Sequence, residues 1–495
     1  MTNYLFPQNM AEWQTLGLFF LTLGVVLALA EGLKKYLSLS DEFSRKFVHV
    51  AVGVLVWIYS VNLDAPNVII FLSLIFTLIN FVVLKFNLLP ALSTKRISYG
   101  TVFYPLTIAI SAWVFWYDDK NIFYISVWVL AVADALAAVV GQSVKTPLRL
   151  KVWHDVKSLQ GALAMFASST LIVFLVYYIN GETSSALPLW LLAPVAGIFI
   201  ALAELISARG SDNFSVVLAT AFILNALSHG TEAAAMNYVW ATAIGALFVL
   251  TVVALKLLSP EGGVATYLMA IVIYGVGGWT WALPIVVFFI SSSLLSFFKS
   301  GYKKRFKEQF SKTSRRDGHQ VFANGGVALL VAFIYYLYPQ PNLYFIYLAA
   351  LAAANADTWG TELGVLSPGR PRLISTMEKV EKGRSGAVSL IGFLASFLGS
   401  LAVVAAGYLL LPLQNLSLFY LAALISGFFS SLADSIIGAS LQAQFRNKNG
   451  LLTEKDEQGS LALVSGWRWM NNDWVNFLSI SLASLFCGLL ISLIS

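Results

Sequence analysis

The sequence has few charged residues and a single cysteine. Only 11% of its 495 residues are charged, which is too few to cover the surface of a soluble protein of this length. Cys487 is the only cysteine, so the chain has neither an intrachain disulfide framework nor a Cys-rich metal site. No Lys or Arg precedes Lys34. Because a cleavable signal peptide begins with basic residues, we expect the first apolar stretch to be retained as a helix.

Hydrophobic residues are abundant instead. They make up 58% of the chain, and the mean hydropathy is +0.77. Apolar runs long enough to cross a bilayer, about 20 residues each, recur from Trp13 to Ser495. We count about sixteen, including runs that begin near residues 262, 281 and 385. The pattern predicts an all-α polytopic membrane protein with about 14 to 16 transmembrane helices.

The positive charges lie almost entirely on one side of the predicted helices. Thirty of the 31 Lys and Arg residues fall in alternate loops, and only Lys120 falls in the other set. Because cytoplasmic loops collect Lys and Arg, these loops are expected in the cytoplasm and both termini outside. The net charge of +6 then reports orientation and contact with anionic membrane lipids. It does not indicate a nucleic-acid partner.

Four carboxylates interrupt the apolar runs, namely Asp134, Glu204, Asp357 and Asp434. Carboxylates inside spanning helices are costly and usually mark function. The predicted topology puts all four near the cytoplasmic ends of their helices, where the helix dipole does not stabilise negative charge and a bound cation would. The alternative is that each carboxylate only pairs with a nearby hydroxyl or Lys.

Two segments of the chain share a pattern. Gly141 follows Asp134 by seven residues, and Gly364 follows Asp357 by the same interval. Downstream, each segment carries a cation, a hydroxyl and a small residue before an apolar helix. These are Lys157, Ser158 and Gly161 in one, and Gly383, Arg384, Ser385 and Gly386 in the other. A helix start of this kind can hold phosphate. The pattern predicts two related parallel units, 1–235 and 236–495.

Phosphoryl transfer from a nucleotide to a lipid fits these features. Magnesium takes hard oxygen ligands and bridges nucleotide phosphates, cations offset the charge on the transferred group, and the reaction needs mainly positioning. The sequence contains neither a Walker A motif nor the protein-kinase catalytic loop. Helix ends and loops of the membrane domain would therefore have to bind the nucleotide.

The first half resembles the membrane family of dolichol kinases, phytol kinases and phosphatidate cytidylyltransferases. The residues that carry the resemblance are Arg45, Lys46, His49, Asp134, Gly141, Lys157, Ser158, Gly161, Glu204, Asp212 and Asn213. His49 could pair with phosphate, act as a base or cap its helix.

The second half is similar to the family that includes the plant phytyl-phosphate kinases. The matching residues are Arg316, Asp317, Asn324, Asp357, Glu362, Gly364, Gly383, Ser385, Gly386, Asp434, Asn472 and Asp473. The two resemblances imply a fusion that converts a prenol to its monophosphate and then to its diphosphate, with CTP or another nucleotide triphosphate as donor.

Roles follow as hypotheses. Asp134 and Asp357 would bind Mg²⁺ or accept the proton from the attacking oxygen, and Lys157 and Arg384 would contact nucleotide phosphates. Further metal ligands would come from Glu204, Glu362, Asp434 and Asp473. Two other functions stay open, a CTP-dependent cytidylyltransferase acting on a lipid phosphate and a lipid transporter. The sequence does not specify the prenol length, the nucleotide, the oligomeric state, or whether the halves form one composite site.

Overall fold

The computed structural model describes residues 6–38, 40–86, 99–153, 155–181, 187–298, 315–382, 384–413, 416–446, 452–454, 456 and 461–495. The chain divides into two compact units, Met1–Thr242 and Ala243–Ser495, and each is described by itself. A duplication of one unit with a boundary at residue 235 remains our proposal.

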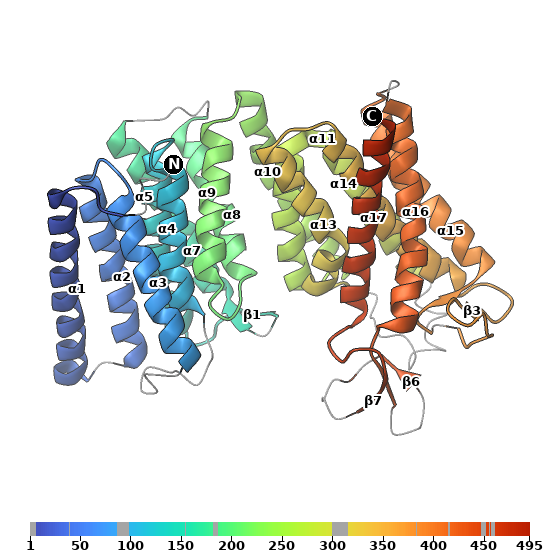
Figure 1. Ribbon diagram of the computed structural model, residues 1–495, viewed down its shortest axis with the longest axis horizontal. Helices are drawn as coiled ribbons and strands as arrows, with labels where there is room; N and C mark the ends of the chain where they lie inside the picture. Colours follow the sequence, from blue (N-terminus) through green and yellow to red (C-terminus); the bar gives the residue numbers. More distant parts are fainter. Residues whose placement is uncertain are drawn as a thin grey trace. The chain divides into compact units, whose positions relative to one another are not determined.

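The first unit is a bundle of helices with one short hairpin (Figure 1). The hairpin pairs β1 with β2 in antiparallel register. A π-helical turn, Val129–Ala133, joins α5 to α6. The elements are α1 (Met10–Leu37), α2 (Asp41–Val61), α3 (Asn67–Phe86), α4 (Gly100–Phe115), α5 (Lys120–Trp128), α6 (Asp134–Ser143), β1 (Arg149–Val152), β2 (Asp155–Ser158), α7 (Leu159–Asn180), α8 (Leu189–Leu205), α9 (Asp212–Ser228) and the beginning of α10 (Glu232–Ala254).

The second unit is also helical, with short strands gathered at the end opposite the C-terminus (Figure 1). β3 pairs with β4, and β5 lies between β6 and β7. The elements are α11 (Pro260–Phe298), α13 (Gly318–Leu337), α14 (Asn342–Gly364), β3 (Arg372–Leu373), β4 (Ala387–Val388), α15 (Leu390–Leu410), α16 (Ser417–Ser440), β5 (Gln444–Arg446), β6 (Leu452–Thr453), β7 (Ala462–Ser465) and α17 (Asn472–Ile494).

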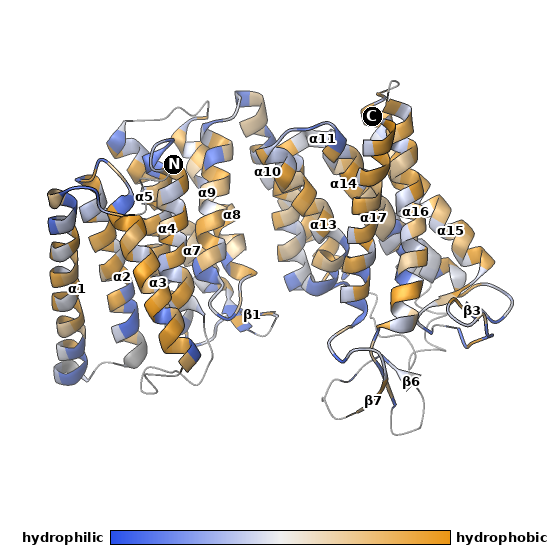
Figure 2. Cartoon of the chain, viewed as in Figure 1, coloured by the Kyte–Doolittle hydropathy of each residue, from blue (hydrophilic) through white to orange (hydrophobic). Residues whose placement is uncertain are grey.

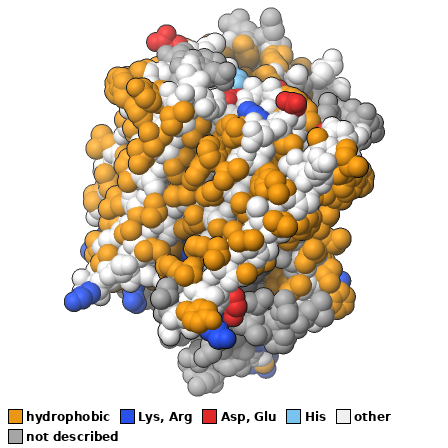
Figure 3. Space-filling view, turned by 90° about the vertical axis from the view of Figure 1, so that its left-hand side faces the viewer, with side chains coloured by type: hydrophobic (Ala, Val, Ile, Leu, Met, Phe, Trp, Pro, Cys, Tyr) orange, Lys and Arg blue, Asp and Glu red, His pale blue; other side chains and the backbone are white. Residues whose placement is uncertain are grey.

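The predicted class, an all-α polytopic membrane protein, is confirmed. Among the described residues, 11 helices are long and apolar enough to span a membrane, and α4, α8 and α9 are shorter apolar helices. Hydrophobic residues dominate the helices in both units (Figure 2). On the face shown in Figure 3, apolar side chains cover the middle and charged ones lie toward the ends. Outward-facing Leu21, Leu247 and Leu485 are 65–71% exposed, as expected for side chains in contact with lipid.

The helices predicted near residues 262 and 281 form two segments of α11. Gly278 has φ 56° and ψ −146°, outside the helical region, and a side chain would strain that left-handed conformation. The second segment returns toward the start of the first, because Phe289 packs with Leu258 and Val252.

The helix predicted to begin near residue 385 begins at Leu390 instead. Its N-cap is Ser389, whose hydroxyl accepts from the Gly392 N–H at 3.2 Å. This cap satisfies one of the free N–H groups of the first turn.

α14 forms the centre of the second unit. Its residues from Leu348 to Ala354 are fully buried, and four of the five residues from Ala350 to Ala354 are alanines. Small side chains allow neighbouring backbones to approach closely in membrane proteins. α14 therefore holds Asp357, near its C-terminal end, at a fixed position among α13, α15, α16 and α17.

Candidate active sites in the two units

Asp134 in the first unit follows the π-helical turn directly. Such turns are rare and frequently occur at functional sites. The Asp134 carboxylate is mostly buried, and Lys46 of α2 contacts it at 2.5 Å. The first of the four predicted carboxylates is thus paired with a cation that the sequence also singled out.

His49 lies beside this pair. Its Nε2 is 3.9 Å from Asp134 and donates to the Leu130 carbonyl in the π-helical turn at 2.8 Å, while the His49 carbonyl accepts from the Tyr104 hydroxyl at 2.9 Å. α2 begins at Asp41, so His49 is not at the helix start and does not cap it. The capping alternative is wrong, and a role beside Asp134 remains.

Lys157 in β2 forms a second cluster. Its ammonium contacts the Glu204 carboxylate and lies 3.6 Å from Asp212 at the start of α9. Burial alone would lower the pKa of Lys157, but Glu204 and Asp212 outweigh burial and raise it above the usual value. The ammonium therefore stays charged at neutral pH. The two clusters are electrostatically coupled through Asp134 and Lys157.

Ser158 and two glycines bring these clusters together. The Ser158 hydroxyl accepts from the Gly161 N–H at 3.1 Å and caps α7, as predicted for a helix start. A Cβ atom at Gly141 would lie 2.7 Å from that hydroxyl and 3.6 Å from the Gly161 Cα. Only glycine allows α6 and α7 to approach this closely.

The second unit contains a cavity of about 270 Å³. Nine of the residues singled out in this half line it, far apart in sequence but adjacent in space. They are Arg316, Asn324, Asp357, Glu362, Arg384, Ser385, Gly386, Asp434 and Asn472.

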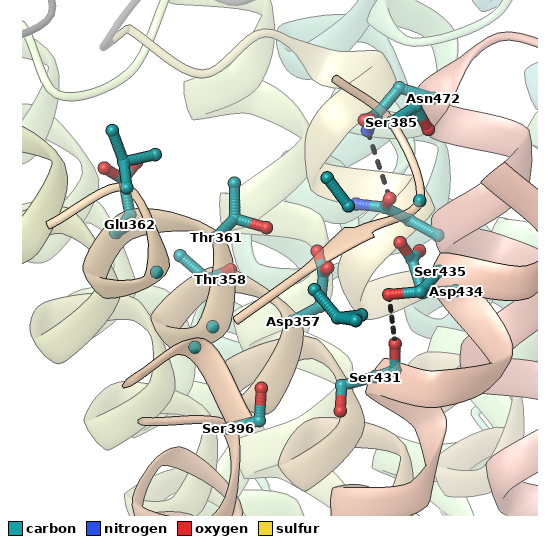
Figure 4. Close-up of a pocket in the computed structure, with 18 of the residues that line it drawn as sticks. Asp357, Thr358, Thr361, Glu362, Ser385, Ser396, Ser431, Asp434, Ser435 and Asn472 are labelled. Atoms are coloured by element: carbon teal, nitrogen blue, oxygen red, sulfur yellow. Dashed lines mark hydrogen bonds between the residues drawn. The ribbon is translucent and has the colours of Figure 1, made fainter. Parts of the chain in front are cut away.

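Carboxylates and cations face the same cavity. In Figure 4, Asp357, Asp434 and Asn472 lie in one part of it, and Glu362 lies apart from them. The Glu362 carboxylate is buried and accepts from the Ser296 hydroxyl at 2.8 Å, and Ser479 donates to Asp434 at 3.4 Å. The cavity thus combines acidic oxygens with basic side chains, as a phosphate-transfer site requires.

A chain of amides forms part of the cavity wall. Asn472 donates to the Asn476 side-chain oxygen and Asn476 donates to that of Asn324, both at 3.0 Å. Asn324 in turn donates to the Gln320 carbonyl at 2.8 Å. This network joins α17 to α13 and fixes the amide oxygens beside the carboxylates.

The structure corrects the predicted match between the two helix starts. Ser385 and Gly386 precede α15 by several residues, and Ser385 donates to Gln442 at 2.7 Å rather than capping a helix. Ser389 and Gly392 instead reproduce the cap made by Ser158 and Gly161. Arg384 is therefore not at a helix N-terminus, although it lines the cavity.

Several predicted residues lie elsewhere. Asp317 caps α13 by accepting from the Gln320 N–H, Asn213 donates to the Gly100 carbonyl at 2.8 Å, and Arg45 is exposed on α2. Asp473 is in the first turn of α17 and is not among the cavity-lining residues. Gly383 lies outside the described residues.

Sequence reasoning missed Lys382, which also lines the cavity. Its ammonium donates to the carbonyls of Val365 at 3.1 Å and Ser367 at 2.5 Å. Lys382 thus stabilises the carbonyls that follow α14. Basic residues are common in such loops, so no signal in the sequence distinguishes it.

The oxygen-rich side chains fit a magnesium ion only with help from other ligands. Within the part of the chain that the structure describes, no three His, Cys, Asp or Glu side chains gather closely enough to hold a metal. Asp357 and Asp434 nevertheless line one cavity with amide and hydroxyl oxygens, which are hard ligands suited to Mg²⁺. Mg²⁺ usually keeps waters and takes one or two carboxylates plus substrate phosphates, so this donor set is sufficient.

Comparison with known proteins gives several relatives. The phytol kinase of Synechocystis sp. is 36% identical over 223 residues, which are 44% of this chain and 93% of that protein. An uncharacterized membrane protein of Methanocaldococcus jannaschii is 32% identical over 211 residues, 43% of this chain and 84% of that protein. Protein PGR of Arabidopsis thaliana is 30% identical over 260 residues, 47% of this chain and 89% of that protein.

No solved structure matches the chain. The family model described as integral membrane protein DUF92 matches residues 243–484, which include every residue assigned above to the cavity of the second unit. With relatives at 30% identity or more that are covered over most of their length, the chain belongs to the DUF92 family of integral membrane proteins.

Proposed function

We propose that the protein is a membrane kinase that phosphorylates a long prenol to the monophosphate in its first unit and the monophosphate to the diphosphate in its second. The similarity to a phytol kinase supports a kinase-type enzyme with a prenol substrate. The observation that carries the proposal is the cavity of the second unit, where Asp357 and Asp434 lie with Arg316 and Arg384 in one membrane-embedded unit.

Each step would transfer one phosphoryl group. The acceptor oxygen, an alcohol in the first step and a phosphate oxygen in the second, forms a bond to the γ-phosphorus of the nucleotide. The bond from that phosphorus to the β-bridging oxygen breaks, and the nucleoside diphosphate leaves with the electron pair. In the first step the alcohol proton passes to Asp134 or, through it, to water. Cations near the phosphates stabilise the charge that the transition state spreads over the oxygens.

Magnesium would be held by Asp134 and Glu204 in the first unit, and by Asp357, Glu362 and Asp434 in the second, with Asp473 nearby. When bound, the ion would neutralise phosphate charge and orient the nucleotide. Lys157 and Arg384 would bind the nucleotide phosphates, and Ser158 and Ser385 would lie beside them. We further propose CTP as donor and a cytoplasmic orientation for both sites, which the one-sided distribution of basic residues supports.

The test is a reaction with the purified full-length protein in detergent. Magnesium and each of the four nucleoside triphosphates are supplied with prenols of several lengths, and the lipid and nucleotide products are resolved by mass. We expect prenyl monophosphate, prenyl diphosphate and nucleoside diphosphate. Pyrophosphate together with a nucleotidyl lipid would favour the cytidylyltransferase instead, and unchanged lipids would reject a kinase.

A further inference from the structure

We propose that Arg316 binds the phosphate of the prenyl monophosphate in the cavity of the second unit. This inference rests on the proposed function, because it assigns to that cavity an acceptor that already carries negative charge. It names the residue that would distinguish this anionic acceptor from a neutral prenol.

The backbone at Arg316 is fixed on both sides. Its N–H donates to the Leu257 carbonyl at 3.1 Å, and its carbonyl accepts from the Ser259 N–H at 2.8 Å. A Cβ atom at Gly262 would lie 2.6 Å from the Arg316 carbonyl oxygen, so the connection between α10 and α11 packs tightly against residue 316. A side chain that starts from so rigid a position can be aimed at a ligand.

Two aromatic rings hold the guanidinium. Its central carbon lies 5.4 Å from the ring centroid of Phe288 and 5.8 Å from that of Phe289, both in α11. A cation over ring faces is attracted electrostatically, and the flat guanidinium keeps N–H donors at its edge for a second partner. Burial lowers the pKa of Arg316 to about 10, against the opposing effect of Glu362. The side chain therefore remains charged at neutral pH.

The other cations near the two sites have closer partners. Lys46 contacts Asp134 and Lys157 contacts Glu204 in the first unit, and Lys382 is bonded to two carbonyls. Across the residues that the structure describes, no carboxylate lies within ion-pair distance of the Arg316 guanidinium, although the side chain lines the cavity. Its fork of donors matches a phosphate group.

The depth of Arg316 favours the acceptor over the donor. The residue lies just before α13, next to the helices that hold Asn324 and Glu362, whereas Arg384 is exposed in the loop before α15. A lipid phosphate attached to a membrane-embedded tail stays close to the helices, and a nucleotide enters from the loops. The two arginines would then bind the two reacting phosphates separately.

The test measures binding of farnesyl monophosphate and farnesol to the full-length protein in detergent by equilibrium dialysis. Arg316→Gln should weaken binding of the monophosphate at least tenfold, because a charge-assisted bidentate contact is lost, and leave farnesol binding unchanged. Arg316→Lys should lose less, since it keeps the charge without the fork. The matched control is Arg315→Gln, which removes the same charge from the neighbouring exposed residue and should bind both ligands like the wild type.

The outcomes separate the two proposals. A wild type that binds farnesyl monophosphate, with Arg316→Gln and Arg316→Lys binding it equally well, would overturn the role of Arg316 and leave the kinase proposal standing. A raised nucleotide KM in Arg316→Gln with unchanged binding of the monophosphate would also overturn it, because the arginine would then belong to the donor. A wild type that binds neither prenyl ligand would contradict the proposed function itself.

Discussion

Gly161 in α7 lies directly against Ala137 in α6: a Cβ atom at position 161 would stand 2.9 Å from the Ala137 carbonyl oxygen and 3.0 Å from the Ser158 hydroxyl. The helix that carries Asp134 and the loop that carries Lys157 are therefore held together through a contact between backbones.

Gly161→Ala should separate the two helices. The new methyl group would meet a backbone carbonyl, which cannot move aside as a side chain can, so α7 and its Ser158 cap must shift. Small displacements of positioned groups are costly in catalysis, and we expect the rate of prenol phosphorylation to fall about tenfold to a hundredfold. Gly24→Ala in α1 is the matched control, since nothing lies within 4 Å of a Cβ there. Wild-type rates for Gly161→Ala would show that the contact is not needed.

Much of the second site was predictable from the sequence. Asp357 and Asp434 stand out because they interrupt apolar helices, and the interval from Asp357 to Gly364 repeats that from Asp134 to Gly141. Costly residues in a hydrophobic context carry strong information about function. The structure places both carboxylates beside one cavity.

The remaining errors have physical causes. Both Ser385 and Ser389 precede the apolar run, and a single sequence does not say which of them ends the loop. The distance to the next glycine could have decided it, because Ser389 and Gly392 have the same spacing as Ser158 and Gly161. The contact of Lys157 with Glu204 and Asp212 joins residues far apart in the chain, and no local pattern encodes it.

Substituting the two aspartates should separate the two reactions. Asp134→Asn should stop formation of the monophosphate and leave its conversion to the diphosphate intact, and Asp357→Asn should do the reverse. Losing a base or a metal ligand should slow the affected step on the order of a hundredfold or more. Single-turnover assays with prenol and with prenyl monophosphate measure each step. If either variant stays folded and loses both steps, the units share one composite site.

Removing the charge of Lys157 should destabilise the first unit. Lys157→Met leaves Glu204 buried without its cation, and breaking a buried pair by removing one partner costs roughly 3–5 kcal/mol. The double variant Lys157→Met with Glu204→Gln no longer buries that lone charge, so its melting temperature should recover part of the loss. Thermal unfolding of both variants in detergent measures this. A double variant no more stable than the single one would mean that Glu204 does not depend on Lys157.

The same pair should make stability depend on alkaline pH. The folded-state pKa of Lys157 lies above its model value of 10.5, so the charged ammonium stabilises the fold fully below that pH and this contribution is lost as the pH rises beyond it. Melting temperatures of the wild type should therefore fall more steeply above about pH 10.5 than those of Lys157→Met. Parallel curves for the two proteins would exclude the linkage.

Orientation can be tested with single cysteines in a variant that lacks Cys487. Asn62 lies between α2 and α3, and Lys151 lies in β1 of the same unit. The distribution of basic residues predicts that a cysteine at position 62 labels from outside the cell with a membrane-impermeant reagent and that one at position 151 labels only after the membrane is opened. Labelling of both positions from the same side would contradict the orientation and with it a cytoplasmic nucleotide site.

Arg384 should act on the nucleotide rather than on the lipid. Its side chain is exposed in the loop before α15 and also lines the cavity, so it can reach the phosphates of a nucleotide that enters from the loops. Arg384→Ala should raise the nucleotide KM of the second step by about tenfold, the loss expected for one charge-assisted contact, and change the prenyl-phosphate KM little. Arg372→Ala is the control, because that arginine is exposed in β3 and donates to the Met377 carbonyl. An unchanged nucleotide KM with a raised prenyl-phosphate KM would assign Arg384 to the acceptor phosphate, where it would compete with Arg316 for the same group.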